Sequence, residues 1–348
     1  MSVRLYGETK GWGSQAVVMK GFMEAMPEAI AFDLDNDLDN DLDETEARVL
    51  GADAKHGVFL GQLTQLVRAR MAGNHERFWA MVAPNSDTIG RTLLDLIEAH
   101  ATDVLVPSMW AKAVMSDLTR LPITVVPHGV SRNWAGRHAM LKPPRPSSFQ
   151  VLHMTSTTTD RKGTKALMQA WRAAMSNGKL PGDSVLRIVC VPEMRITIIE
   201  LAEEYGIAGS VEAMSRLNMP PAYAKGFYKA HDYICQPSRG EGFGMVPLEA
   251  LASGVPVIAT GCTGHSEWAG AIGTPPLVLV NWGEREPIDD FPGSKAPIVH
   301  TEDVYKALVR AYEERHEFKE VAESMAARIQ TEWSWTAKLA YFKKVLEK

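Results

Sequence analysis

Cysteine is scarce in this sequence, and long hydrophobic runs are missing. The 348 residues include three cysteines, Cys190, Cys235 and Cys262, whose spacing fits neither a CxxC metal site nor a disulfide framework. We therefore expect buried, reduced thiols, which suit a reducing cytoplasm. No stretch approaches the roughly 18 apolar residues that would cross a bilayer. No apolar run follows Arg4 either, so we expect a cytoplasmic protein without a signal peptide or transmembrane segment.

Neither sign of charge dominates the composition. The formal net charge is −5, which gives no general attraction to nucleic acids or membranes, although local patches can still provide one. With 45% hydrophobic and 23% charged residues, the composition is typical of a water-soluble globular protein. A chain of 348 residues is too long for one ordinary core and long enough for two α/β domains.

Short apolar runs alternate with segments of helical periodicity along most of the chain. Strands are expected at residues 29–32, 78–82, 103–106, 123–126, 150–154, 186–191, 233–235 and 255–259. Helices are expected at residues 92–100, 109–118, 247–253 and most of 302–348. Strand–helix–strand units of this spacing predict right-handed crossovers and parallel sheets, which bind ligands at the carboxyl ends of their strands.

One segment interrupts this alternation. Residues 131–148 are rich in proline, contain no acidic residue and lack periodicity, which is typical of an interdomain linker. The basic residues of the segment are Arg132, Arg137, Lys142 and Arg145. We therefore predict a first domain over residues 1–130, the linker, a second domain over 149–325 and a C-terminal helix over 326–348.

The densest motif lies between residues 237 and 259, where a predicted strand runs into a predicted helix. The glycines at positions 240, 242 and 244 allow the backbone to approach a ligand closely. The helix that follows would aim its first N–H groups and the positive end of its dipole at an anion. Glu241 and Glu249 lie eight residues apart around this turn, and carboxylates accept hydrogen bonds from the hydroxyls of a ribose or a sugar ring.

This motif resembles the Glu-x7-Glu signature of retaining glycosyltransferases of family 4, which have the GT-B fold. Flanking segments at residues 230–233, 261–267 and 331–335 resemble further elements of that family. The resemblance covers most of residues 103–348 and is weak over the first hundred. It implies two facing Rossmann-like, doubly wound α/β domains with a cleft between them. The first would be the acceptor side, the second would bind the nucleotide sugar, and the last helix would cross back to the first.

The resemblance also implies roles for single residues. Glu249 would hold the ribose of the nucleotide, and Glu241 would contact hydroxyls of the donor sugar. The donor sugar and phosphates would be lined by Gly242, Phe243, Gly244 and Met245. A glycine-rich loop that faces the donor in the family corresponds to Gly11, Gly13 and Ser14.

A second cluster follows the first predicted strand of the second domain, at residues 155–163. In the family, a lysine before a glycine and an arginine some residues earlier neutralise the departing diphosphate. Lys162 matches the lysine, whereas threonines and a serine occupy the place of the arginine. We expect Arg161 to take over that role, because a guanidinium binds phosphate through two hydrogen bonds. The alternative for Arg161 is a surface charge at a helix start.

Three residues are candidates for the acceptor side or the cleft. His128 follows the strand predicted at 123–126 and would face the cleft or serve as a structural loop histidine. Members of the family often have a histidine after the strand that corresponds to 78–82. This sequence has Asn85 and Ser86 instead, which are able only to form hydrogen bonds.

The resemblance predicts a retaining hexosyl- or pentosyltransferase that uses a nucleotide-diphosphate sugar, with a UDP-sugar favoured, and an acceptor hydroxyl. The family needs no strong base, because the leaving diphosphate oxygen takes the acceptor proton on the same face. Catalysis then rests on positioning and on stabilisation of charge. We expect no cofactor and no metal. The alternatives are a nucleotide-sugar epimerase of GT-B fold and a non-catalytic nucleotide-sugar-binding protein.

An acidic repeat at residues 33–44 allows two other interpretations. A calcium loop would need glycine where Leu38 stands. An Asp-x-Asp motif that holds a metal-bound nucleotide sugar belongs to a different, single-domain transferase fold. We therefore expect a solvated acidic loop.

The acceptor has two candidate classes, a glycan or lipid hydroxyl and a hydroxymethylated pyrimidine in DNA. Residues 55–77 contain a basic cluster that would form an acceptor face, the alternative being an ordinary solvated helix. The cluster consists of Lys55, His56, Arg68, Arg70, His75 and Arg77. The compact first domain also resembles short family 4-like transferases of bacterial viruses, some of which glycosylate hydroxymethylated DNA bases, although likeness of form alone does not establish function.

Overall fold

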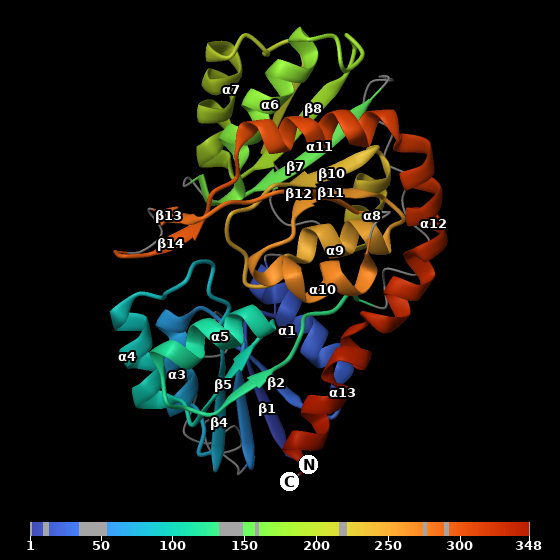
Figure 1. Ribbon diagram of the computed structural model, residues 1–348. Helices are drawn as coiled ribbons and strands as arrows, with labels where there is room; N and C mark the ends of the chain where they lie inside the picture. Colours follow the sequence, from blue (N-terminus) through green and yellow to red (C-terminus); the bar gives the residue numbers. More distant parts are fainter. Residues whose placement is uncertain are drawn as a thin grey trace. The chain divides into compact units, whose positions relative to one another are not determined.

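The computed structural model describes residues 2–9, 14–34, 54–131, 149–156, 160–215, 221–273, 277–288 and 292–347. The chain divides into two compact units, here called the first and second domains. The first consists of Met1–Ser131 together with Glu332–Lys348, and the second of Arg132–Thr331. Each is built on one six-stranded sheet (Figure 1). Residues 132–148 of the predicted linker lie outside the described residues.

The sheet of the first domain has the order β2-β1-β3-β4-β5-β6, and every neighbouring pair is parallel. Its strands are β1 (Val3–Gly7), β2 (Ile30–Asp33), β3 (His56–Phe59), β4 (Arg77–Met81), β5 (Asp103–Val106) and β6 (Ile123–Val125). Its helices are α1 (Ser14–Ala25), η1 (Leu63–Gln65), α3 (Leu66–Met71), α4 (Arg91–His100), α5 (Met109–Leu118) and α13 (Trp335–Leu346).

Alternation along the strands gives this sheet two apolar faces, as expected for a parallel sheet covered on both sides. In β4, Phe78 and Ala80 belong to the core cluster formed with α3, α4 and α5. Trp79 points to the other face, where its ring lies 5.6 Å from that of Phe342 in α13. Helices α1 and α13 therefore cover the second face.

The last helix is packed tightly into the first domain. Trp335 is fully buried, and a Cβ added at Gly21 of α1 would lie 2.1 Å from its ring. Just before α13, the N–H of Val130 donates to the carbonyl of Trp333 over 2.7 Å. The chain thus leaves the second domain at the end of α12 (Arg315–Glu332) and completes the core of the first.

The sheet of the second domain has the order β12-β11-β10-β7-β8-β9, again with parallel pairs throughout. Its strands are β7 (Gln150–Thr155), β8 (Val185–Cys190), β9 (Val211–Ser215), β10 (Tyr233–Gln236), β11 (Val257–Thr260) and β12 (Leu277–Val280). A two-stranded antiparallel hairpin, β13 (Arg285–Pro287) and β14 (Lys295–Pro297), follows β12.

Helices cover both faces of this second sheet. Its helical elements, besides α12, are η3 (Asp160–Lys162), α6 (Thr164–Ser176), η4 (Pro192–Met194), α7 (Arg195–Glu204), α8 (Pro221–Lys229), α9 (Met245–Ala252), η5 (Thr263–His265), α10 (Ser266–Ile272) and α11 (Thr301–Glu313). Figure 1 shows α6 and α11 side by side over one face, where Trp171 and Leu308 join the core. All three cysteines of the domain are buried and free, as their spacing predicts.

Within the described ranges, no helix is both long enough and apolar enough to cross a bilayer.

Candidate functional site

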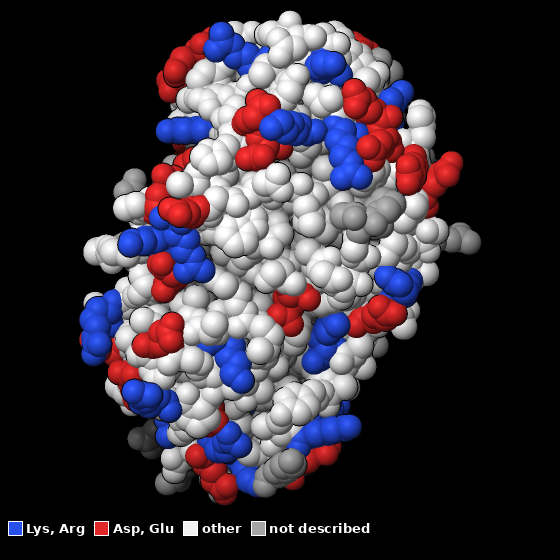
Figure 2. All heavy atoms as spheres, in the orientation of Figure 1, with Lys and Arg blue, Asp and Glu red and all other residues white. Residues whose placement is uncertain are grey.

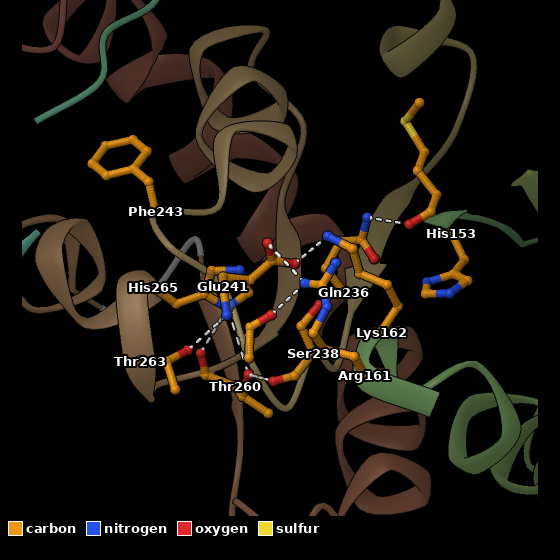
Figure 3. A network of polar contacts seen from close by, with 12 residues as sticks. His153, Arg161, Lys162, Gln236, Ser238, Glu241, Phe243, Thr260, Thr263 and His265 are labelled. Atoms are coloured by element: carbon orange, nitrogen blue, oxygen red, sulfur yellow. Dashed lines mark hydrogen bonds and ion pairs between the residues drawn. The ribbon is translucent and has the colours of Figure 1, made fainter. Parts of the chain in front are cut away.

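The order of the second sheet reverses between β7 and β10, its first and fourth strands in sequence. At such a switch point the connections after the two strands run to opposite faces, which leaves room for a ligand at the carboxyl ends. Two segments follow these ends. One is η3 with Gly163, and the other is the loop of residues 237–244, which leads into α9. Both predicted motifs therefore meet at one place (Figure 3).

A cation pair faces one carboxylate at this place. Lys162 Nζ lies 2.5 Å from Glu241 Oε1, and Arg161 Nη1 lies 3.8 Å from Glu241 Oε2. Arg161 also donates a hydrogen bond of 2.6 Å to the carbonyl of Gly240. The side chains of Arg161, Lys162 and Glu241 are 10%, 15% and 12% exposed, so this is a largely desolvated cluster with a net positive charge.

The electrostatics of Glu241 follow from this arrangement. Burial raises the pKa of its carboxyl, but the charges of Lys162 and Arg161 outweigh burial and bring the pKa down to about 2. Glu241 is therefore ionised at any physiological pH. It is an acceptor for hydroxyl donors and, in the free protein, the counter-ion of Lys162.

Two glycines with positive φ shape the loops. Gly163, at φ +68°, precedes α6, and a Cβ there would lie 2.2 Å from the carbonyl oxygen of Pro237. Gly244, at φ +86°, precedes α9, and a Cβ there would lie 2.1 Å from Cδ2 of His265. α9 starts at Met245, directly after Gly244 and two residues before the start predicted from the sequence.

The turn that follows β11 is hydrogen-bonded to the loop of residues 237–244. Thr263 Oγ1 accepts from the N–H of Glu241 over 3.2 Å, and the N–H of Gly264 donates to the Glu241 carbonyl over 2.8 Å. The indole N–H of Trp268 donates to the Phe243 carbonyl over 3.0 Å. The Phe243 side chain is buried and points away from the polar contacts in Figure 3. Its backbone alone is therefore positioned to line a ligand.

Glu249 lies on the first turns of α9, partly buried. The hydroxyl of Tyr228 in α8 donates to Glu249 Oε2 over 2.9 Å. Burial raises the pKa of the Glu249 carboxyl to about 7, although the hydrogen bond from Tyr228 acts in the opposite direction. The two carboxylates of the motif thus have opposite electrostatics, since Glu241 is held ionised and Glu249 is near half-protonation at neutral pH.

Sequence reasoning missed two histidines of this region. His153 in β7 is fully buried between the Cys235 carbonyl, 2.8 Å from Nδ1, and Thr164 Oγ1, 2.9 Å from Nε2. His265 donates from Nδ1 to the carbonyl of Thr260 over 3.1 Å. Burial lowers the pKa of both imidazoles, so both are neutral and hold the loops together. Only their polar character within apolar strands and turns signals them in the sequence.

The other predicted residues lie in the first domain or outside the described ranges. Gly11 and Gly13 are outside them, and Ser14 is the first residue of α1. Asn85 is partly exposed beyond the carboxyl end of β4, and the neighbouring Ser86 is buried and donates to the Thr88 carbonyl over 3.0 Å.

His128 is buried beside the last helix. Its ring centroid lies 5.5 Å from that of Trp335, and burial lowers the pKa of the imidazole to about 3. Of the two expected roles, this environment favours a structural loop histidine over a group exposed for binding.

The basic cluster of residues 55–77 is divided between exposed residues, such as Lys55 and Arg68, and buried ones. His56 and His75 are buried, and burial lowers the pKa of both. Arg77 pairs with Asp103 and stacks 4.4 Å from the Trp79 ring centroid. His56 and Arg77 are also the first residues of β3 and β4, at the amino ends of the strands. Ligands of such sheets bind at the opposite edge.

The acidic repeat of residues 33–44 lies outside the described residues from position 35 onward. Asp33 ends β2 and accepts a hydrogen bond from the Thr9 hydroxyl. Within the part of the chain that the structure describes, no three His, Cys, Asp or Glu side chains are grouped as a metal site would require.

Comparisons with known proteins find similarity over the same region. The family model described as glycosyl transferases group 1 matches residues 148–284. A D-inositol 3-phosphate glycosyltransferase of Corynebacterium urealyticum is 34% identical over 121 residues, which are 33% of this chain and 28% of that protein. A lipopolysaccharide core biosynthesis mannosyltransferase of Rhizobium meliloti is 54% identical over 41 residues, or 12% of each chain. The matched segments thus span less than a third of these relatives.

Solved structures resemble the chain over its full length. Sucrose-phosphate synthase from Thermosynechococcus elongatus has a TM-score of 0.72 at 15% identity, covering 100% of this chain and 98% of the other. Anabaena HepE, in complex with UDP and glucose, has a TM-score of 0.69 at 15% identity, covering 100% and 99%. At these identities the likeness concerns the fold. The GT-B fold that the sequence predicts is confirmed.

Proposed function

Taking residues 148–284 as a glycosyl transferase group 1 domain, we propose that the protein is a retaining glycosyltransferase. It moves a hexosyl or pentosyl unit from a nucleotide-diphosphate sugar to an acceptor hydroxyl. The observation that carries this proposal is the meeting of Lys162, Arg161 and Glu241 at the switch point of the second sheet, with Glu249 on the adjoining helix. The two cations can pair with a diphosphate. The two carboxylates can accept hydrogen bonds from the hydroxyls of a sugar and a ribose.

Each residue has a chemical task in this proposal. Lys162 and Arg161 neutralise the diphosphate, and the backbone of Gly242 to Gly244, followed by Met245, lines the donor. Glu241 accepts from hydroxyls of the sugar, and Glu249 accepts from the ribose. The low pKa of Glu241 keeps it an acceptor, as this role requires.

The transfer balances without a protein base. The bond from the anomeric carbon to the diphosphate oxygen breaks, and a bond from that carbon to the acceptor oxygen forms on the same face. The acceptor proton moves to the leaving diphosphate oxygen. Negative charge grows on the diphosphate during this step, so fixed cations in a desolvated site stabilise the transition state more than the ground state.

Uridine diphosphate is the favoured nucleotide. Support comes from the likeness of fold to HepE, which was solved with UDP and glucose. No metal or cofactor is invoked, because the two cations supply the positive charge that a diphosphate requires.

For the acceptor we favour a hydroxyl of a glycan or lipid. In the basic cluster that kept DNA as a candidate, two histidines are buried and Arg77 is paired with Asp103, which leaves fewer exposed cations than the sequence suggests. On the face shown in Figure 2, blue and red side chains are interspersed, without a continuous basic area among the described residues. A surface that binds the backbone of duplex DNA would need such an area, because Lys and Arg side chains neutralise its phosphates.

A panel experiment tests the donor and the acceptor class together. Nucleotide sugars are first screened by thermal shift, because a bound donor raises the melting temperature by mass action. Donors that bind are then offered with glycan and lipid acceptors and with hydroxymethylated duplex DNA, and products are identified by mass spectrometry. A sugar mass added to a glycan or lipid supports the proposal. Addition to the DNA base would replace the acceptor, and the absence of any donor shift would contradict the function.

A further inference from the structure

Arg239 lies directly before Gly240 and Glu241, and its side chain is buried among three separate elements. Nε donates to the carbonyl of Pro297 in β14 over 3.0 Å, and Nη2 donates to Glu286 Oε1 in β13 over 2.7 Å. Nη1 lies 3.9 Å from Asp160 Oδ2 in η3. The residue is 8% exposed, so these contacts form in a poorly solvated place where charge-assisted hydrogen bonds are strong.

The backbone beside Arg239 is tied to the other cationic segment. The N–H of Arg239 donates to the carbonyl of Arg161 over 2.8 Å. In return, Nη1 of Arg161 donates to the carbonyl of Gly240 over 2.6 Å. These reciprocal bonds join the loop after β10 to the loop after β7, across the switch point.

Asp160 connects Arg239 to the turn that contains Lys162. Its Oδ1 accepts from the N–H of Lys165 over 3.3 Å, and its carbonyl accepts from the N–H of Gly163 over 2.9 Å. Burial raises the pKa of the Asp160 carboxyl, while the charge of Arg239 lowers it. Asp160 thus closes the turn that presents Arg161 and Lys162.

The β13–β14 hairpin gives Arg239 an anchor. At its base, the N–H of Gly283 donates to the Ile298 carbonyl over 2.8 Å, and the N–H of Ile298 donates to the Glu284 carbonyl over 2.9 Å. Further along, Ser294 Oγ donates to the Ile288 carbonyl over 2.8 Å. In sequence the hairpin lies between β12 and α11, and Figure 1 shows it projecting from the side of the second sheet. Its contacts with Arg239 connect this ribbon to the site.

We propose that Arg239 is a positioning residue for the transfer reaction, anchored by the β13–β14 hairpin. It sets the placement of Lys162, Arg161 and Glu241 without contacting the reacting groups itself. An arginine is needed, because a lysine lacks the planar fork that satisfies Pro297 and Glu286 together. The inference rests on the proposed function, since the reaction is what the positioned groups serve.

Steady-state kinetics of Arg239→Ala and Arg239→Lys test the role. We expect kcat to fall about 10- to 100-fold in Arg239→Ala, because small misplacement of catalytic groups has effects of this size. The donor KM should change less than about threefold, since Glu249 still holds the nucleotide. Arg239→Lys should recover only a small part of the loss. An unchanged kcat in both variants would overturn the proposal.

Arg187 provides the matched control. It is similarly buried in the same domain, pairs with Glu212 over 2.6 Å, and lies in β8 away from both loops. Arg187→Lys should lower the melting temperature while leaving kcat unchanged. An equal loss of kcat in this variant would mean that kcat reports general destabilisation, and would overturn the assignment. Glu286→Gln is a milder test from the other end of the contact, because the Glu286 side chain is 46% exposed. We expect about a twofold to fivefold loss of kcat from the weakened anchor, and an unchanged kcat would contradict the role of the hairpin.

Hydrogen exchange separates this inference from the proposed function. Peptides that cover residues 160–165 and 237–244 should exchange faster in Arg239→Ala than in the native protein, and remain unchanged in Arg187→Lys. Faster exchange in a protein that turns over no nucleotide sugar would support the positioning contact and contradict the function. Native exchange at both segments in Arg239→Ala would contradict the positioning contact, whether or not the protein is active.

Discussion

Lys162 and Glu241 lie 79 positions apart in the sequence, and their charged atoms are 2.5 Å apart in the folded protein. They lie in the segments that follow two neighbouring strands, β7 and β10, at the place where the strand order reverses. In the free protein each satisfies the charge of the other. In the proposed reaction Lys162 pairs with the diphosphate in place of Glu241, and Glu241 accepts hydrogen bonds from hydroxyls of the sugar.

The first prediction concerns Lys162. We expect Lys162→Ala to lower kcat about 100-fold while changing donor affinity much less, because the ammonium gains most where charge grows in the transition state. Steady-state kinetics and calorimetry measure the two quantities. Lys165→Ala, an exposed lysine three residues along, is the control and should behave as the native protein. A native rate for Lys162→Ala would remove this residue from the chemistry.

The second prediction is a pH dependence of nucleotide binding. The pKa of Glu249 is about 7 in the free protein, and only the ionised carboxylate accepts two hydroxyl hydrogen bonds. Affinity should therefore rise as the pH increases through 7 and level off above it, with about a tenfold loss per pH unit below the pKa. Glu249→Gln should remove this dependence and weaken binding at pH 8.5 by about 1.5–3 kcal/mol. Calorimetric affinities that are equal in the two proteins at every pH would contradict the role.

Tyr228 gives the third prediction. Its hydrogen bond to Glu249 lowers the pKa of that carboxyl, so Tyr228→Phe should move the midpoint of the pH dependence upward. Tyr223→Phe, on the same helix but exposed, should leave the midpoint in place. A midpoint that stays put in both variants would show that the contact does not act on Glu249.

The fourth prediction concerns the turn before α9. Gly244→Ala puts a Cβ into the ring of His265 at a positive φ, whereas Gly206→Ala has a similar φ of +66° and open space around it. Both substitutions strain the backbone, by roughly 1–2 kcal/mol. Gly244→Ala should lose a further 1–3 kcal/mol or so through overpacking. Denaturant unfolding compares the two, and equal losses would refute the tight packing at Gly244.

The fifth prediction is the stereochemistry and its metal dependence. NMR of the product should show retention at the anomeric carbon, and activity should persist in EDTA, since Lys162 and Arg161 supply the positive charge. Inversion would exclude the proposed same-face transfer. Loss of activity in EDTA that a divalent ion restores would move attention to the acidic repeat at residues 33–44.

Much of the fold follows from local patterns in the sequence. The strand at 103–106 and the helix at 109–118 have the predicted bounds, because both are bordered by clear polar or turn residues. Strands β1 and β3 were missed. β1 begins almost at the chain start and includes a charged Arg4, and β3 contains His56 and Gly57, so neither shows a plain apolar run. Parallel pairing with distant strands, which local propensity does not contain, forms them.

The site was predictable as two motifs but not as a network. Glu241 and Lys162 were both expected from the resemblance, whereas their ion pair depends on the strand order, which only the fold reveals. The supports at Arg239, His153 and His265 depend on contacts between residues far apart in the chain. The burial of His56 and His75 within the basic cluster was not predicted either, because it depends on how the first sheet is packed.

The most direct test measures release of nucleoside diphosphate from a panel of UDP-sugars, with acceptor present, by the native protein and by Lys162→Ala. We predict that at least one UDP-sugar binds both proteins, and that the native protein releases UDP from it about 100 times faster than the variant. Equal release by the two proteins, or failure of every nucleotide sugar to bind the native protein, would contradict it.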